Sequence, residues 1–201
     1  MASLDAQGML IDPRIVQQRS MAIEHGDLDG VHAIVLHQTD SSSAEGALNS
    51  YRTGPNGAHF LIDTDGTIYQ TASLNKRCYH IGTLIRSRCL ALSKDQCSDP
   101  LVAKARTLGW TAQIKELNRI ERMKSYPARY PVNSDSVGIE MVGRHLDDKT
   151  YEAITAAQQG ALTWLIEVLH TQFSNVGTDD VFRHPDVSYK NPGEAASATW
   201  K

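Results

Sequence analysis

Residues 31–40 constrain the fold of this chain more than any other stretch. They read Val-His-Ala-Ile-Val-Leu-His-Gln-Thr-Asp, an apolar and β-branched run that ends in a histidine and polar residues. Runs of this kind form strands that are buried on both faces, in sheets covered by helices. Such a strand would deliver His37 to the edge of the sheet, where its imidazole can take part in chemistry.

Four further segments carry the pattern of strands. They are residues 58–63, 68–71, 136–142 and 181–183. Asp65 and Gly66, between the first two segments, favour a tight turn and therefore a β-hairpin. Glu140 interrupts the apolar run of the third segment, and His184 directly follows the fourth.

Helical patterns mark the segments that would cover this sheet. Capping-box spacing from Ser42 to Glu45 predicts a short helix to about residue 51, and apolar periodicity predicts a long helix over about 150–173. Residues 83–132 also look helical, and we interpret them as a helical insertion or lid within a single domain spanning 1–201. We expect residues 1–29 to wrap the surface. Together the elements predict an α/β fold, with a central mixed β-sheet flanked by helices.

Composition excludes several classes of function. A net charge of -3 and a pI near 6.2, with basic residues scattered along 201 residues, give no footprint for nucleic acid. We find no apolar run of membrane-spanning length and no signal-peptide pattern in residues 1–7, so we expect no membrane insertion and synthesis in the cytoplasm without a signal peptide.

The cysteines leave the redox compartment open. Cys78, Cys89 and Cys97 are too few for a disulfide framework and lack zinc-ribbon spacing. Cys89 and Cys97 could pair in an oxidising compartment, and two reduced thiols in a cytosolic protein explain the sequence equally well.

His37 and His184 are candidates for a shared zinc ion. Catalytic zinc takes three protein ligands and one open position, and histidine nitrogens with a carboxylate oxygen are a common set. One histidine at a strand end is usually a hydrogen-bonded structural residue. When two histidines lie at the exits of central strands, zinc ligation and a structural role are equally good interpretations. The pattern alone does not decide between them. The chain lacks His-Glu-x-x-His, which argues against a zinc peptidase of that type.

Five fragments of this chain recur, in the same order, in the type 2 N-acetylmuramoyl-L-alanine amidases. This family includes the peptidoglycan recognition proteins, the phage lysozyme-type amidases and the cell-wall recycling amidases. The fragments are Ile-Val-Leu-His (34–37), Ala-His-Phe-Leu-Ile (58–62) with Asp-Gly (65–66), Tyr-His-Ile-Gly (79–82), Asn133 with Ser-Val-Gly-Ile-Glu (136–140), and Arg-His-Pro-Asp-Val (183–187) with Asn-Pro-Gly (191–193). The chain therefore resembles this family over about 31–194, apart from the insertion.

The resemblance implies a zinc amidase with the peptidoglycan recognition protein-like fold. It would cut the amide between the lactyl group of N-acetylmuramic acid and the L-alanine of the stem peptide. His37 and His184 match the zinc histidines, and Glu140 matches the general base of recycling-type members. The setting of Glu140 fits independently, because an apolar strand should raise the pKa of a carboxyl group. A buried glutamate satisfied by backbone or arginine is the alternative.

The third zinc ligand departs from the family pattern. Recycling-type members place an aspartate ten residues after the second histidine, and the other types place a cysteine near there, but no cysteine follows Cys97. Glu194 stands ten residues after His184 and is our expected ligand. If the alignment is instead fixed on the Pro-Gly that follows, Asn191 matches the family aspartate, although an amide is a poor zinc ligand. Asp186 is the remaining alternative.

Three further residues match family positions around the site. Lys190 resembles the family lysine that supports the oxyanion, although its distance along the chain from the last ligand differs. A solvated loop lysine is an equal alternative. His80 and His59 match positions that line the site, which implies substrate contact or orientation of the ligands, and a structural role is at least as good for His59. Ala58 stands where phage and recognition types have tyrosine, which favours the branch that uses glutamate.

We expect the enzyme to act as an antibacterial effector. The tail at 187–195 is similar to that of amidase effectors delivered by type VI secretion. This implies delivery into the periplasm of a target cell, with peptidoglycan or muropeptides as substrate and a cognate immunity protein as partner. The alternatives are a cytoplasmic cell-wall recycling amidase and a non-catalytic peptidoglycan-binding module.

Overall fold

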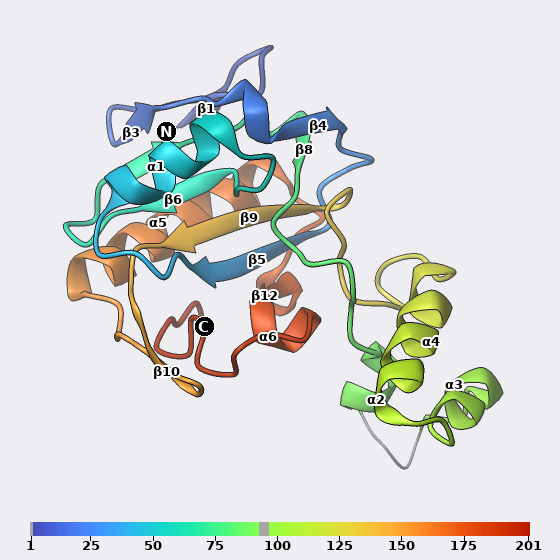
Figure 1. Cartoon of the computed structure of the whole chain (residues 1–201). Helices are drawn as coiled ribbons and strands as arrows, with labels where there is room; N and C mark the ends of the chain where they lie inside the picture. The colour runs from blue at the N-terminus through green and yellow to red at the C-terminus, as the bar shows by residue number, and fades with distance from the viewer. Residues whose placement is uncertain (1, 93–96) are drawn as a thin grey trace.

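The computed structural model describes residues 2–92 and 97–201, and a six-stranded sheet runs through its centre (Figure 1). In sheet order the strands are β12 (Val181–Arg183), β5 (Ala33–Gln38), β9 (Ser136–Met141), β6 (Phe60–Ile62), β7 (Ile68–Gln70) and β3 (Ile15–Gln17). The first four strands are parallel, β7 is antiparallel to β6, and β3 is parallel to β7. The predicted α/β fold with a mixed central sheet is confirmed.

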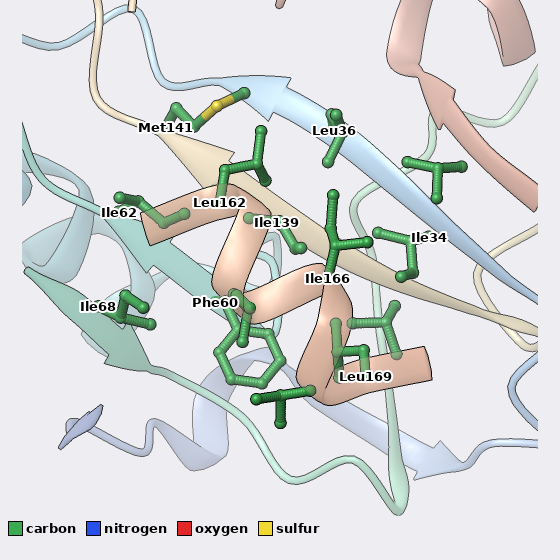
Figure 2. Close-up of a cluster of buried hydrophobic side chains, with 14 of the residues drawn as sticks. Ile34, Leu36, Phe60, Ile62, Ile68, Ile139, Met141, Leu162, Ile166 and Leu169 are labelled. Atoms are coloured by element: carbon green, nitrogen blue, oxygen red, sulfur yellow. The ribbon is translucent and has the colours of Figure 1, made fainter. Parts of the chain in front are cut away.

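Helix α5 (Ala156–Gln172) covers one face of this sheet. Side chains alternate along a strand, so every second residue of the central strands points to α5. Figure 2 shows the resulting core, in which Ile34, Leu36, Phe60, Ile62, Ile139 and Met141 of the strands meet Leu162, Ile166 and Leu169 of the helix. All of these side chains are almost completely buried, which makes this layer the main hydrophobic core.

Helix α1 (Ala44–Thr53) packs on the opposite face. Ala44, Ala47 and Tyr51 of this helix share a buried cluster with Leu61 of β6. His37 lies opposite Glu140 in the ladder between β5 and β9, and Glu140 lies opposite Leu61 in the ladder between β9 and β6. Neighbours across a ladder share a face, so the two polar side chains are on the α1 side of the sheet.

Two predicted helix starts need correction. The long helix begins at Ala156 rather than near residue 150, because Thr155 and Gln158 form a capping box that satisfies the first turn. Thr150–Tyr151 instead forms strand β11, paired with β10 (His145–Asp147). At α1 the helix is present but begins at Ala44, with Ser43 rather than Ser42 as N-cap, and Ser43 makes no side-chain capping hydrogen bond.

The amino-terminal region does more than wrap the surface. It contributes β3 to the edge of the central sheet, and β4 (Glu24–Asp27) pairs with β8 (Lys76–Cys78). Strands β1 (Ser3–Leu4) and β2 (Leu10–Ile11) form a small hairpin, and a 3-10 turn, η1, covers Met21–Ile23. These strands have two to four residues each, and no apolar run like that at residues 31–37 marks them in the sequence.

The segment predicted to be a helical insertion stands away from the sheet in Figure 1. Its helices are α2 (Arg88–Leu92), α3 (Pro100–Ala105) and α4 (Trp110–Arg122), while 93–96 lies outside the described residues. Val102, Ala105, Leu117 and Ile120 give α3 and α4 a small core of their own. The sequence allowed either a disulfide between Cys89 and Cys97 or two reduced thiols. The structure has the disulfide, with Cα atoms 5.3 Å apart.

The carboxyl-terminal part of the chain returns to the sheet. After a 3-10 turn, η2 (Thr178–Asp180), β12 leads directly into the short helix α6 (His184–Val187), and an irregular loop then crosses back beside β5. Across the described residues, we find no helix with the length and apolar character needed to span a membrane.

Candidate active site

Parallel strand pairing brings His37 and His184 together. Arg183 is paired with Leu36 across β12 and β5, so the next residue on each strand path, His184 and His37, stand side by side. Their ring centroids are 4.3 Å apart, and both side chains are buried. The two histidines that the sequence placed at strand exits therefore share one location.

Glu194 reaches the same location from the carboxyl-terminal loop. Its Oε1 lies 2.9 Å from Nδ1 of His184 and 3.4 Å from Nδ1 of His37. One potential ligand atom from each of the three residues lies within 4.8 Å of the others, so the group could hold a metal ion. The structure does not bring the other two candidates here. Asp186 accepts from the backbone N–H of Arg183, and Asn191 donates to the carbonyl of Asp147.

The chemistry of this cluster fits zinc. Two imidazole nitrogens and one carboxylate oxygen form a donor set used by catalytic zinc, with a fourth position left for water or substrate. Burial, reinforced by the neighbouring His184, lowers the pKa of His37 to about 4, so this ring is neutral at pH 7 and can donate a lone pair. Burial opposes the charge of Glu194, but hydrogen bonds from His184 and His37 outweigh it and hold its pKa at about 2. The carboxylate is therefore available as an anionic ligand.

Glu140 stands next to the cluster, on β9. Burial raises the pKa of its carboxyl group to about 7, although a hydrogen bond from Tyr51 works in the opposite direction. The Tyr51 hydroxyl donates to Oε2 of Glu140 over 2.6 Å. A carboxyl group with a pKa near neutrality can both take up and release a proton, which is what general acid–base chemistry requires.

Tyr51 was not singled out in the sequence, and the structure shows why. It falls at the heptad spacing from Ala44, on the buried face of α1, where an aromatic side chain looks like an ordinary core residue. Only its hydroxyl distinguishes it, because a buried tyrosine hydroxyl usually has a hydrogen-bond partner. That partner, Glu140, is distant along the chain.

His80 contacts His37, one of the two clustered histidines. Its Nδ1 lies 3.0 Å from Nε2 of His37, so one of the two nitrogens donates to the other. The ring packs onto Gly138, where a Cβ atom would lie 2.7 Å from Cγ of His80. Asn133 holds the same loop, because its Oδ1 accepts from the N–H of Ile81 over 2.7 Å. His80 is thus placed to orient His37, which is one of the two roles expected from the sequence; the other was substrate contact.

His59 is placed differently. Its Nδ1 accepts from the backbone N–H of Gly138 over 3.1 Å, and its Nε2 donates to the carbonyl of Lys76 over 2.8 Å. The side chain is fully buried and is not among the residues that line the cleft. Both ring nitrogens are bonded to backbone, which corresponds to the structural role considered for this residue.

A cleft of about 720 Å³ opens over these groups. Its lining includes the predicted residues His37, His80, Glu140, His184, Lys190 and Glu194. Lys190 also lines the cleft and is exposed, and its Cε would lie 3.7 Å from a Cβ atom at Gly82. Tyr79 and Tyr151 also line the cleft and were missed in the sequence, because a single tyrosine in or beside a short strand carries no periodic signal.

Comparison with solved structures finds the same fold. A selenomethionine derivative of AmpD matches with a TM-score of 0.57 and 20% identity, covering 98% of this chain and 95% of that one. The catalytic domain of XlyA matches with a TM-score of 0.52 and 19% identity, covering 88% and 87%. AmpDh3 from Pseudomonas aeruginosa, in complex with anhydromuramic pentapeptide, matches with a TM-score of 0.51 and 19% identity, covering 78% of this chain and 51% of that one.

Comparison of the sequence with protein families is more specific. No curated protein matches the chain. The family of N-acetylmuramoyl-L-alanine amidases known as Amidase_2 matches residues 27–196, a span that contains every strand of the central sheet except β3 together with all the residues of the cluster. The chain therefore belongs to the type 2 N-acetylmuramoyl-L-alanine amidase family.

Proposed function

We propose that this protein is a zinc-dependent peptidoglycan amidase. It hydrolyses the amide bond between N-acetylmuramic acid and the L-alanine of the stem peptide. The observation that carries this proposal is the buried group of His37, His184 and Glu194, with Glu140 beside it at the bottom of one cleft, in a chain of this family. The solved complex of AmpDh3 with anhydromuramic pentapeptide supports a muropeptide as substrate.

In this proposal His37, His184 and Glu194 hold the metal. Zinc bound there would supply Lewis-acid chemistry, polarising the scissile carbonyl and making water easier to deprotonate. Glu140 accepts a proton from the attacking water and returns it to the departing amine. Tyr51 donates to Oε2 of Glu140, which leaves Oε1 as the oxygen that takes up the proton. Lys190, which lines the cleft, stabilises the charge that develops on the carbonyl oxygen.

Digestion of purified sacculi tests the reaction. With zinc present, we expect mass spectrometry to find stem peptides with a free L-alanine amino group and glycan strands that have lost them. A chelator should stop the release, and added zinc should restore it. If the zinc-loaded protein sediments with sacculi but frees no L-alanine termini, the protein is a binding module and the amidase proposal fails.

We further propose that the enzyme is an antibacterial effector delivered into the periplasm of a target cell and blocked by a cognate immunity protein. The disulfide between Cys89 and Cys97 supports action in an oxidising compartment, because such bonds rarely persist in the cytosol. Producing the protein separately in the cytoplasm and the periplasm of a test cell decides the matter. Toxicity restricted to the periplasm is expected, and equal growth in both cases would contradict delivery.

A further inference from the structure

A second cavity adjoins the cleft and is built by the helical segment. It has a volume of about 470 Å³, and its walls come from α2, α4 and the loop after α6. They include Arg86, Arg106, Trp110, Gln113, Leu117 and Tyr189. None of these residues takes part in the chemistry proposed above.

One loop carries residues of both cavities. Tyr189 lines the second cavity, and the next residue, Lys190, lines the cleft. This loop is fastened to the chain ahead of α2, because the N–H of Arg86 donates to the carbonyl of Val187 over 2.7 Å and Ser188 Oγ donates to the carbonyl of Leu84 over 2.8 Å. Because adjacent residues of this loop line the two cavities, a substrate bound in the cleft has the second cavity as its neighbour.

The chemistry of the second cavity suits an anion with some apolar surface. The guanidinium of Arg86 lies 4.8 Å from the ring centroid of Tyr189, and its Nε donates to the carbonyl of Ser188 over 3.0 Å. Arginine has five N–H donors in a planar fork that matches a carboxylate. Arg106 also lines the cavity, and among the described lining residues none is acidic.

Aromatic rings and a helix start complete this surface. The rings of Trp110 and Tyr189 meet edge to face with centroids 6.0 Å apart, and Trp110 is 68% exposed. Tryptophan is enriched at binding interfaces, and an indole this exposed can pack against a ligand. Helix α4 begins at Trp110 and has no acidic residue in its first turn, so the partial positive charge of its N-terminus adds to that of Arg86.

We propose that this cavity binds the carboxylate-bearing part of the stem peptide during hydrolysis. This inference rests on the proposed amidase function, and it names the region of the substrate that the helical segment recognises. Stem peptides carry free carboxylates, whereas the glycan hydroxyl and acetamido groups are neutral. The guanidinium of Arg86 therefore favours the peptide, and Trp110 packs on its aliphatic parts.

Charge changes at Gln113 test the proposal without touching Arg86, which also supports the loop. Gln113 lines the cavity and is partly exposed, so Gln113→Glu and Gln113→Lys should both fold. Ala112→Glu is the matched control, because it adds the same charge to the same turn of α4 on an exposed residue outside the cavity. The probe is the free stem pentapeptide, which has no scissile bond, titrated calorimetrically into the full chain.

We expect Gln113→Glu to weaken pentapeptide binding by about two- to fivefold and Gln113→Lys to strengthen it by a similar factor. Added salt should make both differences in affinity smaller. Trp110→Ala should weaken binding about tenfold, as truncation of an aromatic anchor does. Ala112→Glu should bind like the unchanged protein. In kinetics, Gln113→Glu should raise the KM for a muramoyl pentapeptide relative to that for N-acetylmuramoyl-L-alanine.

The outcomes separate this inference from the amidase proposal. Equal pentapeptide affinity in Gln113→Glu and Gln113→Lys, or no measurable binding, overturns the second site even if sacculi are hydrolysed. Charge-dependent binding in a chain that hydrolyses nothing supports the second site and overturns the amidase proposal. A response to Ala112→Glu as large as that to Gln113→Glu would show a general field effect and would overturn the site as well.

Discussion

The candidate active site has two parts, a strand half, whose residues lie on or directly after strands of the central sheet, and a loop half, whose residue lies on the carboxyl-terminal loop. His37 and Glu140 lie opposite each other on β5 and β9, in the middle of the central sheet, and His184 follows β12 directly. Glu194 belongs to an irregular loop with neither helix nor strand. The ladder hydrogen bonds that hold the first half are numerous and cooperative, whereas the second half depends on a few individual contacts.

Those few contacts can be named. The side chain of Gln38, on β5, accepts from the N–H of Ala195 over 2.9 Å and so ties the loop to the sheet. Gly193 passes so close to the Lys149 carbonyl that a Cβ atom would lie 2.2 Å from its oxygen. The comparison teaches that the strand half should tolerate mild changes nearby, while the loop half should lose its geometry when one contact is altered.

The largest effect is expected on the strand half, at Glu140. Glu140→Gln keeps the shape of the side chain but removes its ability to accept a proton, so kcat should fall by about 10²–10⁴. Steady-state hydrolysis of a muropeptide measures this, and metal analysis should find zinc still bound. Activity close to that of the unchanged protein would remove Glu140 from the role of base.

The loop half should control metal affinity. Glu194→Gln removes the anionic donor, and zinc affinity should fall by more than the roughly 10–100-fold caused by losing a residue that only orients a ligand. Competition with a chelating dye measures this loss. Asp186→Asn is the matched control and should keep its zinc, because Asp186 is exposed and caps α6. The opposite result, with zinc lost only in Asp186→Asn, would transfer the ligand role to Asp186.

A smaller effect should follow from crowding the loop. Gly193→Ala places a methyl group against the Lys149 carbonyl, and overpacking of this kind costs about 1–3 kcal/mol of unfolding free energy. Urea denaturation measures this loss, and zinc affinity should fall with it. Gly160→Ala, inside α5, has nothing within 4 Å of the new methyl group and should stabilise the protein by about 0.5–1 kcal/mol. Equal stability of the two variants would contradict the tight packing of the loop.

The smallest effect concerns the pH profile. A base works only when ionised, so kcat/KM should fall as the pH drops through the pKa of Glu140, which is about 7 without metal and lower beside a bound cation. The hydrogen bond from Tyr51 lowers this pKa. Tyr51→Phe should therefore move the acidic limb of the profile to higher pH with little change at its plateau. A limb that stays in place or moves to lower pH would contradict the contact between the two side chains.

Sequence patterns predicted the strand half of the site because its signals are local. A continuous apolar, β-branched run indicates a strand buried on both faces, and the exits of such strands lie at one edge of a parallel sheet. These patterns placed His37 and His184 at strand exits and Glu140 within a strand, and the resemblance to the amidase family implied that the three residues share one site. The same reasoning failed for β3, because Ile15 and Val16 lie between Arg14 and Gln17 and do not belong to a longer apolar run.

The tertiary structure alone decided the rest. Glu194, Asp186 and Asn191 were alternatives in the sequence, because an irregular loop has no period that orients its side chains, and long-range contacts such as that between Gln38 and Ala195 set its path. Tyr51 likewise meets Glu140 only because α1 packs on the sheet. Local patterns thus determined which strands form and where their polar ends lie. Which loop side chain completes the site depended on packing between segments far apart in the chain, and no short stretch of sequence contains that information.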